Sequence, residues 1–530
     1  MKKYQPVIGM EVHAQLKTKS KMFCGCQNGF GLEKEANINI CPVCTAQPGS
    51  LPVINEEAVK MVIKTGLALD CKIAEDSFFE RKNYFYPDLP KGYQISQYQK
   101  PLCYEGYLEV MVNNRHAEPF GLAPGWLVSA SRDETLKQVQ GDGMGENLRK
   151  IRIRRIHLEE DTGKLLHQKE ASYSLVDFNR AGVPLMELVT EPDIQSGEEA
   201  REFCQELQLI LRYLGVSEAE MENGQMRCEV NISLRESGFE KKELGTKVEI
   251  KNLNSFRVVK RAIEHEAKRQ AEVLKRGEKV IQETRGWDDN RGVTFSQRIK
   301  EEAHDYRYFP EPDLPPLRSL NDRKLLLMAE IPELPQAKRL RLTGEYSLPE
   351  NDTEAFAQNK ELGEYFEEVC SELTRTEHET RKFNEAELKK LYKLAANYLI
   401  TEIPRAADKL KAYDYELRGK ITPENFAEFT VIVFKGIVSS SGAQILLEEM
   451  FKTGIDPTHV IETKNLAQVG DVVALGTVID EIIEKNPQPV EDYKKGKEAS
   501  LQFLVGQVMK KTGGKANPQV VMEILKRKLC

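Results

Sequence analysis

Acidic residues and a histidine recur at every second position near the start of the chain. Residues 7–16 alternate apolar side chains with Glu11, His13 and Gln15. Because successive side chains of a strand point to opposite faces, these three polar residues would share one face. Carboxylate oxygens and a histidine nitrogen can bind a divalent ion, so this face could support metal-dependent chemistry.

Three later segments, at 151–161, 226–235 and 247–251, show the same alternation, and each has an apolar side that could be buried. Lys, Arg and Asn side chains on such faces can bind phosphate oxygens. The pattern favours an Mg-ATP site on an antiparallel sheet over a plain solvated face, which is common. The polar sides carry Arg155, His157, Glu159 and Asp161, then Arg227, Glu229, Asn231, Ser233 and Arg235, and then Lys247, Glu249 and Lys251.

Familiar nucleotide and hydrolase motifs are absent. The sequence has no G-x-x-x-x-G-K-[ST] loop and no Gly-rich fingerprint between a strand and a helix, so ATP would be bound in another way. It also has no G-x-S-x-G elbow, so chemistry that releases ammonia from glutamine is not visible in this chain.

Four cysteines form two close pairs. Cys24 and Cys26 are followed, after fourteen residues, by Cys41 and Cys44. Two close pairs separated by a loop are typical of a structural zinc ribbon with no open coordination position. The alternative is four reduced, buried cysteines. The remaining six cysteines are scattered and are expected to be core or surface thiols.

Composition and charge exclude several classes of protein. The 530 residues are 40% hydrophobic and 30% charged, which is typical of a globular protein and not of a disordered one. No segment approaches the roughly 20 apolar residues of a membrane span, and no signal peptide is recognisable, so we expect a cytoplasmic protein. A net charge of −7 limits any RNA contact to local patches.

We expect an α+β fold, with an antiparallel-sheet region followed by two all-α regions. The predicted boundaries are 1–293, 294–410 and 411–530. In the last region, Thr422 and Pro423 are typical of a helix start, and Gly454 of a helix end. Residues 486–489 (NPQP) are predicted to be a linker. Beyond them, residues 494–530 hold nine Lys/Arg and two Glu, which is a candidate phosphate-binding surface or a solvated helix face.

Several motifs together resemble the family of bacterial aspartyl/glutamyl-tRNA amidotransferase B subunits (the GatB family). The resemblance covers nearly the whole chain, in order. It is carried by residues 7–16 (VIGMEVHAQL), 41–44 (CPVC), 48–53 (PGSLPV), 81–97 (RKNYFYPDLPKGYQISQ), 157–161 (HLEED), 179–185 (NRAGVPL), 249–256 (EIKNLNSF), 305–314 (DYRYFPEPDL), 506–511 (GQVMKK) and 516–518 (ANP).

The resemblance implies a reaction and partners. A separate A-type partner would hydrolyse glutamine, and a small C-type partner would complete a heterotrimer. This chain would bind Glu-tRNA(Gln), Asp-tRNA(Asn) or both, phosphorylate the side-chain carboxylate with ATP and Mg²⁺, and let ammonia displace phosphate. The sheet region would be a catalytic cradle, and the last region a tRNA-binding tail.

The resemblance also suggests roles for single residues. Glu11, His13, Glu159 and Glu229 are the expected Mg²⁺ ligands, with His157 close to them. Lys91 resembles a residue at the exit of an ammonia tunnel. The candidates for binding ATP phosphates or the substrate carboxylate are Lys251, Arg81, Asn231, Asn252 and Asn254.

Three features depart from the family pattern. Position 229 is Glu where Asp is expected, and Ala46 stands where Gly is usual. Residues 113–147 look like an insertion between two cradle strands. Three other functions compete: a non-catalytic zinc-ribbon RNA-binding protein, an archaeal-type enzyme that amidates only Glu-tRNA(Gln), and a stand-alone ATP-dependent ligase. The archaeal-type family carries an extra domain for which the spacing leaves no room, and the acidic strand faces speak against a surface built only to bind RNA.

Overall fold

The fold is described from a computed structural model, which divides into two compact units, Met1–Leu334 and Pro335–Cys530. The boundaries expected at 293 and 410 stay predictions. The described residues are 4–29, 35–112, 148–167, 172–236, 244–299, 306–375, 383–412, 415–467, 472–513, 516 and 518–529.

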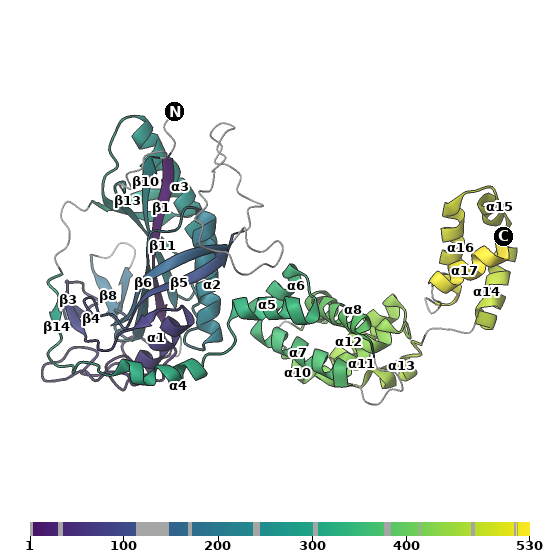
Figure 1. The fold of residues 1–530 in the computed structure, drawn as a ribbon, viewed down its shortest axis with the longest axis horizontal. Coiled ribbons are helices and arrows are strands. Elements are labelled where there is room, and N and C mark those ends of the chain that lie inside the picture. The colour runs from purple at the N-terminus through teal and green to yellow at the C-terminus, as the bar shows by residue number, and fades with distance from the viewer. Residues whose placement is uncertain are drawn as a thin grey trace. The chain divides into compact units, whose positions relative to one another are not determined.

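A nine-stranded sheet forms the centre of the first unit (Figure 1). Its strands are β1 (Tyr4–Gln15), β2 (Lys72–Ile73), β5 (Cys103–Met111), β6 (Leu148–Glu160), β9 (Pro184–Thr190), β10 (Met226–Glu236), β11 (Val248–Leu253), β12 (Glu283–Asp288) and β13 (Val293–Ile299). The order is β13-β12-β11-β10-β1-β9-β6-β5-β2, antiparallel except for the pair β11–β12. The four alternating segments are β1, β6, β10 and β11, so these strand predictions are confirmed.

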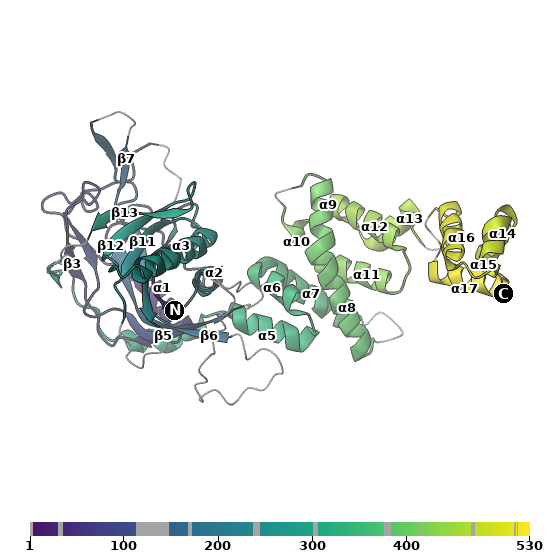
Figure 2. The same ribbon diagram turned by 90° about the horizontal axis from the view of Figure 1, so that it is seen from above.

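Three helices cover the apolar face of this sheet: α1 (Glu56–Ala68), α2 (Gly197–Tyr213) and α3 (Phe256–Lys275). Figure 2 shows them from above. The sequence starts α2 and α3 in the same way, because Ser196 and Ser255 each accept a hydrogen bond from a backbone N–H in the first turn. The apolar side of β1, including Met10 and Val12, is 0–1% exposed in the core beneath them. The polar side of β1 therefore faces away from these helices.

A smaller three-stranded sheet is fixed against the end of β6. It consists of β14 (Phe309–Pro310), β3 (Glu80–Asn83) and β4 (Tyr93–Ser96), in that order. The Gln94 side-chain amide donates to the Glu160 carbonyl at 2.8 Å, and Leu158 N–H donates to the Gln97 amide oxygen at 3.0 Å. These contacts hold β3 and β4 beside the C-terminal end of β6. The unit also contains the hairpin β7 (Lys164–His167) and β8 (Ser174–Asp177), the 3₁₀ turn Leu320–Arg323 and the helix α4 (Lys324–Ala329).

The second unit is built from helices in its described residues, apart from connecting loops and the isolated bridge between Val438 and Ala467, and it has two hydrophobic cores. An α+β chain with a mostly helical C-terminal half was expected, and this is confirmed. The first core is formed by α5 (Pro335–Tyr346), α6 (Glu350–Gln358), α7 (Lys360–Arg375), α8 (Glu385–Asn397), the π-helical turn Tyr398–Glu402, α9 (Ile403–Lys409), α10 (Leu417–Lys420), α11 (Pro423–Phe434), α12 (Ser440–Thr453) and α13 (Pro457–Lys464). The second is formed by α14 (Val472–Lys485), α15 (Pro487–Lys494), α16 (Glu498–Lys511) and α17 (Pro518–Leu529).

The helix boundaries of this unit test two predictions and correct a third. Thr422 caps α11, and Gly454 ends α12 in the left-handed conformation, as predicted. The linker predicted at 486–489 is wrong, because α15 begins at Pro487. A proline in the first turn loses no hydrogen bond, since the first N–H groups of a helix have no partner within it. Among the described helices, none is long and apolar enough to cross a membrane.

Candidate functional site

Strand β1 lies between β9 and β10, and the register of these strands gathers acidic residues on one face. Glu11 is paired with Glu229 of β10, and His13 with Glu187 of β9. One strand further on, His157 of β6 is paired with the same Glu187. Glu249 of β11 is paired with Asn231 of β10. The polar face therefore continues across five strands, and two clusters of ligand-type side chains form on it.

The first cluster is centred on Glu187. Nε2 of His13 lies 3.4 Å from Oε2 of Glu187 and 3.6 Å from Oε1 of Glu159. Nε2 of His157 lies 3.3 Å from the same Glu187 oxygen. His157, Glu159 and Glu187 are buried, and His13 is 15% exposed. Two imidazoles thus meet one buried carboxylate, with a second carboxylate beside it.

The ionisable groups of this cluster shift one another's pKa values. Burial alone would lower the pKa of His13, but the hydrogen bond and charge of Glu187 and the charge of Glu159 raise it to about 9. Burial alone would raise the pKa of Glu187, but His157 and His13 hold it well below its ordinary value. These interactions favour the imidazolium form of His13 and the ionised form of Glu187.

The second cluster contains Glu11, Glu229 and Glu249. Burial and the charges of Glu187 and Glu229 raise the pKa of Glu11. Nζ of Lys251 donates to Oε2 of Glu229 at 2.8 Å and lies 3.4 Å from Oε1 of Glu249. The Asn231 side-chain amide donates to Oε1 of Glu11 at 2.8 Å. Close carboxylates that repel one another favour a cation among them.

The predicted magnesium ligands are divided between these two clusters. His13, Glu159 and Glu187 form one group of possible ligands, and Glu11, Glu229 and Glu249 form the other. In each group one ligand atom per residue lies within 4.8 Å of the others.

The donor sets of both groups fit a hard divalent cation such as Mg²⁺, because they are rich in carboxylate oxygen. Two buried atoms on this face, Oδ1 of Asn231 and Nδ1 of His157, have no hydrogen-bond partner within the described part of the chain. Unpaired buried polar atoms are rare, and here they fit a face that receives a ligand.

Sequence reasoning missed Glu187 and did not select Glu249 as a ligand. Glu187 lies in the strand PLMELVT, of which every residue is buried. The available signal was this single acid in a strand with no other charged residue, since a buried acid requires partners. Glu249 was placed on the polar face, but only the register with Asn231 and Thr284 brings it to this cluster.

Arg81 is engaged away from the polar face. Its guanidinium donates to both carboxylate oxygens of Glu311 at 2.7 Å and to Asp313 at 3.3 Å, and it lies over the Tyr93 ring. The next residue, Lys82, points to the opposite side of β3. Burial lowers the pKa of Lys82, but Glu159, Tyr308 and Glu187 together raise it above its ordinary value.

Asn252 and Asn254 lie where β11 gives way to α3. Asn252 has a left-handed backbone, with φ of 63°, next to an irregularity in the pairing of β10 and β11. Both side chains are exposed. The following helix begins at Phe256, so these amides stand beside a helix N-terminus, where anions are favoured.

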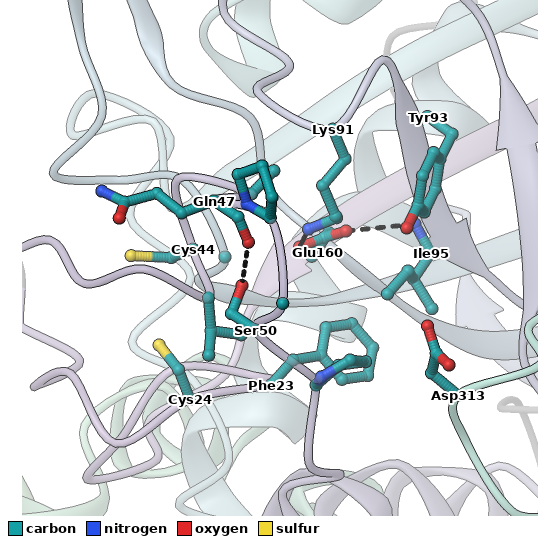
Figure 3. A pocket seen from close by; sticks show the side chains of 16 residues that line it. Phe23, Cys24, Cys44, Gln47, Ser50, Lys91, Tyr93, Ile95, Glu160 and Asp313 are labelled. Atoms are coloured by element: carbon teal, nitrogen blue, oxygen red, sulfur yellow. Dashed lines mark hydrogen bonds and ion pairs between the residues drawn. The ribbon is translucent and has the colours of Figure 1, made fainter.

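A pocket of about 170 Å³ separates the cysteine cluster from Lys91 (Figure 3). Nζ of Lys91 donates to Oε2 of Glu160 at 2.6 Å, and Ile95 N–H donates to the other oxygen at 3.1 Å. Glu160 follows Glu159 on β6, so the two carboxylates point to opposite faces of the strand. Glu160 therefore lines the pocket, while Glu159 belongs to the acidic cluster on the other face.

The four predicted zinc ligands converge. The sulfur atoms of Cys24, Cys26, Cys41 and Cys44 lie within 4.8 Å of one another. Contact with Cys24 lowers the pKa of Cys44, and the nearby Lys21 ammonium lowers it further. Backbone N–H of Cys41 also donates to Cys44 Sγ at 3.1 Å. Four converging cysteine sulfur atoms fit tetrahedral zinc, and a lowered pKa of Cys44 favours the thiolate that zinc binds.

The basic end of the chain carries counterions of its own. Lys528 pairs with Asp480 at 2.6 Å, and Lys495 pairs with Glu491 at 3.2 Å. Lys511 pairs with Glu481. Part of its charge is therefore already neutralised. The insertion at 113–147, Asp305 and Asn517 lie outside the described residues.

Comparison with known proteins follows the same two regions. A family model described as "GatB/GatE catalytic domain" matches residues 6–323, and one described as "GatB domain" matches residues 381–529. Relatives from Caldicellulosiruptor saccharolyticus, Carboxydothermus hydrogenoformans and Persephonella marina are named as B subunits of aspartyl/glutamyl-tRNA(Asn/Gln) amidotransferase. In that order, they are 46%, 44% and 44% identical to this chain. The alignments cover 99%, 100% and 99% of this chain and the same percentages of the relatives' own lengths.

Proposed function

Since the chain belongs to the family of aspartyl/glutamyl-tRNA(Asn/Gln) amidotransferase B subunits, we propose that it uses ATP to activate the side-chain carboxylate of mischarged tRNA. The substrates are Glu-tRNA(Gln), Asp-tRNA(Asn) or both, and ammonia then converts the activated acid to the amide. The relatives are named as B subunits of aspartyl/glutamyl-tRNA(Asn/Gln) amidotransferase, which supports this reaction.

The reaction needs activation because hydroxide is a poor leaving group from a carboxylate at neutral pH. Bound ATP would supply the phosphoryl group, so that ammonia displaces phosphate in place of hydroxide. The task of the protein is to position the groups and to neutralise negative charge.

The observation that carries the proposal is the pair of carboxylate clusters on one sheet face. His13, Glu159 and Glu187 would hold one Mg²⁺, and Glu11, Glu229 and Glu249 would hold a second. Lys251 and Asn231 already donate to this second group and could turn a donor toward a phosphate or carboxylate oxygen. Asn252 and Asn254 would extend the anion site at the start of α3. Arg81 would act through its ion pair with Glu311 by fixing β3.

The remaining expectations follow from the family. Ammonia would come from the A-type glutaminase partner, the small C-type partner would complete the heterotrimer, and the protein would work in the cytoplasm. Lys91 would lie at the exit of the ammonia path, beside the pocket of Figure 3. Zinc would hold the two cysteine loops together, and the helices of the tail would contact tRNA.

The test is amidation by this chain co-expressed with its A-type and C-type partners. We expect Gln-tRNA or Asn-tRNA only when ATP and Mg²⁺ are present, and the two mischarged tRNAs tested in parallel give the substrate range. Glu11→Ala should abolish product while glutaminase activity persists. Tight tRNA binding without ATP turnover or product in the wild type would favour the non-catalytic RNA-binding alternative.

A further inference from the structure

Lys82 is a cation that lies beside the Glu187 cluster and over two tyrosine rings. Its ammonium lies 5.2 Å from the ring centre of Tyr306 and 5.8 Å from that of Tyr84. Among the described residues, no carboxylate oxygen lies within 4.0 Å of it, although Glu159 and Glu187 are its main charged neighbours. A purely structural cation in this half-buried position would be expected to pair with one of them, because removing an unpaired charge from water is costly.

Arg155 is a second incompletely paired cation in the same place. It shares its face of β6 with His157 and Glu159. Its guanidinium lies 3.8 Å from Oε1 of Glu187, which is too long for a hydrogen bond. Its Nε is buried and has no partner within the described part of the chain. The planar guanidinium thus keeps donors available for an acceptor that the protein does not supply.

A row of tyrosines connects the two cations. The Arg155 guanidinium lies 5.5 Å from the ring centre of Tyr98. Tyr98 stacks on Tyr308 with ring centres 4.6 Å apart, and Tyr308 contacts Tyr306, the ring beneath Lys82. Both cations therefore border one aromatic wall. Ser96 Oγ, at the end of β4, lies 3.5 Å from Oε2 of Glu159 and ties this wall to the cluster.

We propose that Lys82 and Arg155 bind the phosphoryl oxygens of the nucleotide at the His13–Glu159–Glu187 cluster. The inference rests on the proposed function, which it deepens by assigning the cations that face the reacting phosphate. A divalent ion would neutralise the two carboxylates, and the two cations would then neutralise the phosphate. Ammonium and guanidinium groups are the usual partners of phosphate oxygens, and the guanidinium can bind two of them.

Chemical protection in the wild-type complex tests the proposal without any variant. The complex is treated with a limiting amount of a lysine-acylating reagent in the presence of Mg²⁺. Three samples are compared: one with ATP, one with uncharged tRNA and one with neither. Peptide mass spectrometry then gives the rate at each lysine. We expect Mg-ATP to slow acylation of Lys82 by about tenfold. Lys150 lies over the Tyr107 ring at 3.3 Å on the same strand, β6, as Arg155, and its rate should not change. Lys82 reactivity unaffected by Mg-ATP, or slowed by tRNA alone, would overturn the proposal.

Equilibrium binding gives a second measurement. Lys82→Met should weaken Mg-ATP binding about tenfold or more, Lys82→Arg should retain most of it, and Lys150→Met should bind like the wild type. Protection of Lys82 in a complex that does not amidate would refute the proposed function alone. Normal amidation with an unprotected Lys82 would refute this inference alone.

Discussion

Asp161 directly follows β6, at the end of the acidic face. Its replacement by Asn should destabilise the first unit. Its carboxylate accepts hydrogen bonds from Gln15 at 2.7 Å and Arg227 at 3.0 Å, and Arg180 lies 3.6 Å away. The side chain is 2% exposed. Asp161→Asn removes the charge and turns an amide N–H₂ toward groups that are themselves donors.

The size of the effect follows from the exposure of the partners. Breaking a fully buried ion pair costs about 3–5 kcal/mol, and a hydrogen bond to a charged group contributes about 1.5–3 kcal/mol. Arg227 is 39% exposed and Arg180 30%, so water partly replaces the lost carboxylate. We therefore expect the free energy of unfolding to fall by about 2–3 kcal/mol at pH 7.

The effect should depend on pH in one direction. Burial alone would raise the pKa of Asp161, but Arg227, Arg180 and Gln15 lower it in the folded protein. The stabilisation by the carboxylate is then fully present above about pH 4, the pKa of an unfolded Asp, and is lost as pH falls through the lower folded value. The difference between wild type and Asp161→Asn should shrink below about pH 4.

Urea unfolding followed by tryptophan fluorescence measures this difference. Trp287 lies in β12 of the first unit and is 8% exposed, so its emission reports the unfolding of that unit. Asp76→Asn is a control at an exposed position of the same unit. Equal stability of Asp161→Asn and wild type at pH 7, or a difference that does not change below pH 4, would refute the reasoning.

Three further changes test the site and its surroundings. Glu187→Gln should reduce ATP-dependent amidation by more than the roughly 10–100-fold loss typical of residues that only support metal ligands; near-normal amidation would exclude Glu187 from the site. Cys41→Ser should lose the zinc that elemental analysis finds in the wild type, and equal zinc content would contradict the cysteine site. Ala46 has φ of 56°, so Ala46→Gly should raise the free energy of unfolding by about 1 kcal/mol in the same urea assay, and a destabilised variant would argue against backbone strain there.

The strands and their polar faces were predictable because alternation is local. The pattern around Glu11 and His13 requires only neighbouring residues, and β1 has the predicted polar face. Helix ends such as Thr422 and Gly454 were also predictable, since their capping groups act within a few residues. The convergence of the four cysteines could be expected from their spacing for the same reason.

The grouping of the acidic residues depends on long-range register, which no local pattern contains. Glu187 belongs to the site because β9 pairs with β1 and β6 at the height of His13 and His157. The direction of Lys82, opposite to Arg81, likewise becomes meaningful only once β3 is fixed against the end of β6. Local rules failed at Pro487, because the same residue types, Asn and Pro, are typical both of linkers and of helix starts.

The central position of β1 also has a consequence for synthesis on the ribosome. Its partners are far along the chain, since Tyr4 pairs with Glu236 and Glu11 with Val189. At about 5–20 residues per second, β1 waits roughly 10–50 s after it emerges before β10 is available. For that interval the nascent chain exposes a strand with two unpaired edges and an apolar side, which can attract other chains. Chaperones that bind such segments early should therefore increase the yield of the folded first unit more than those that act after release.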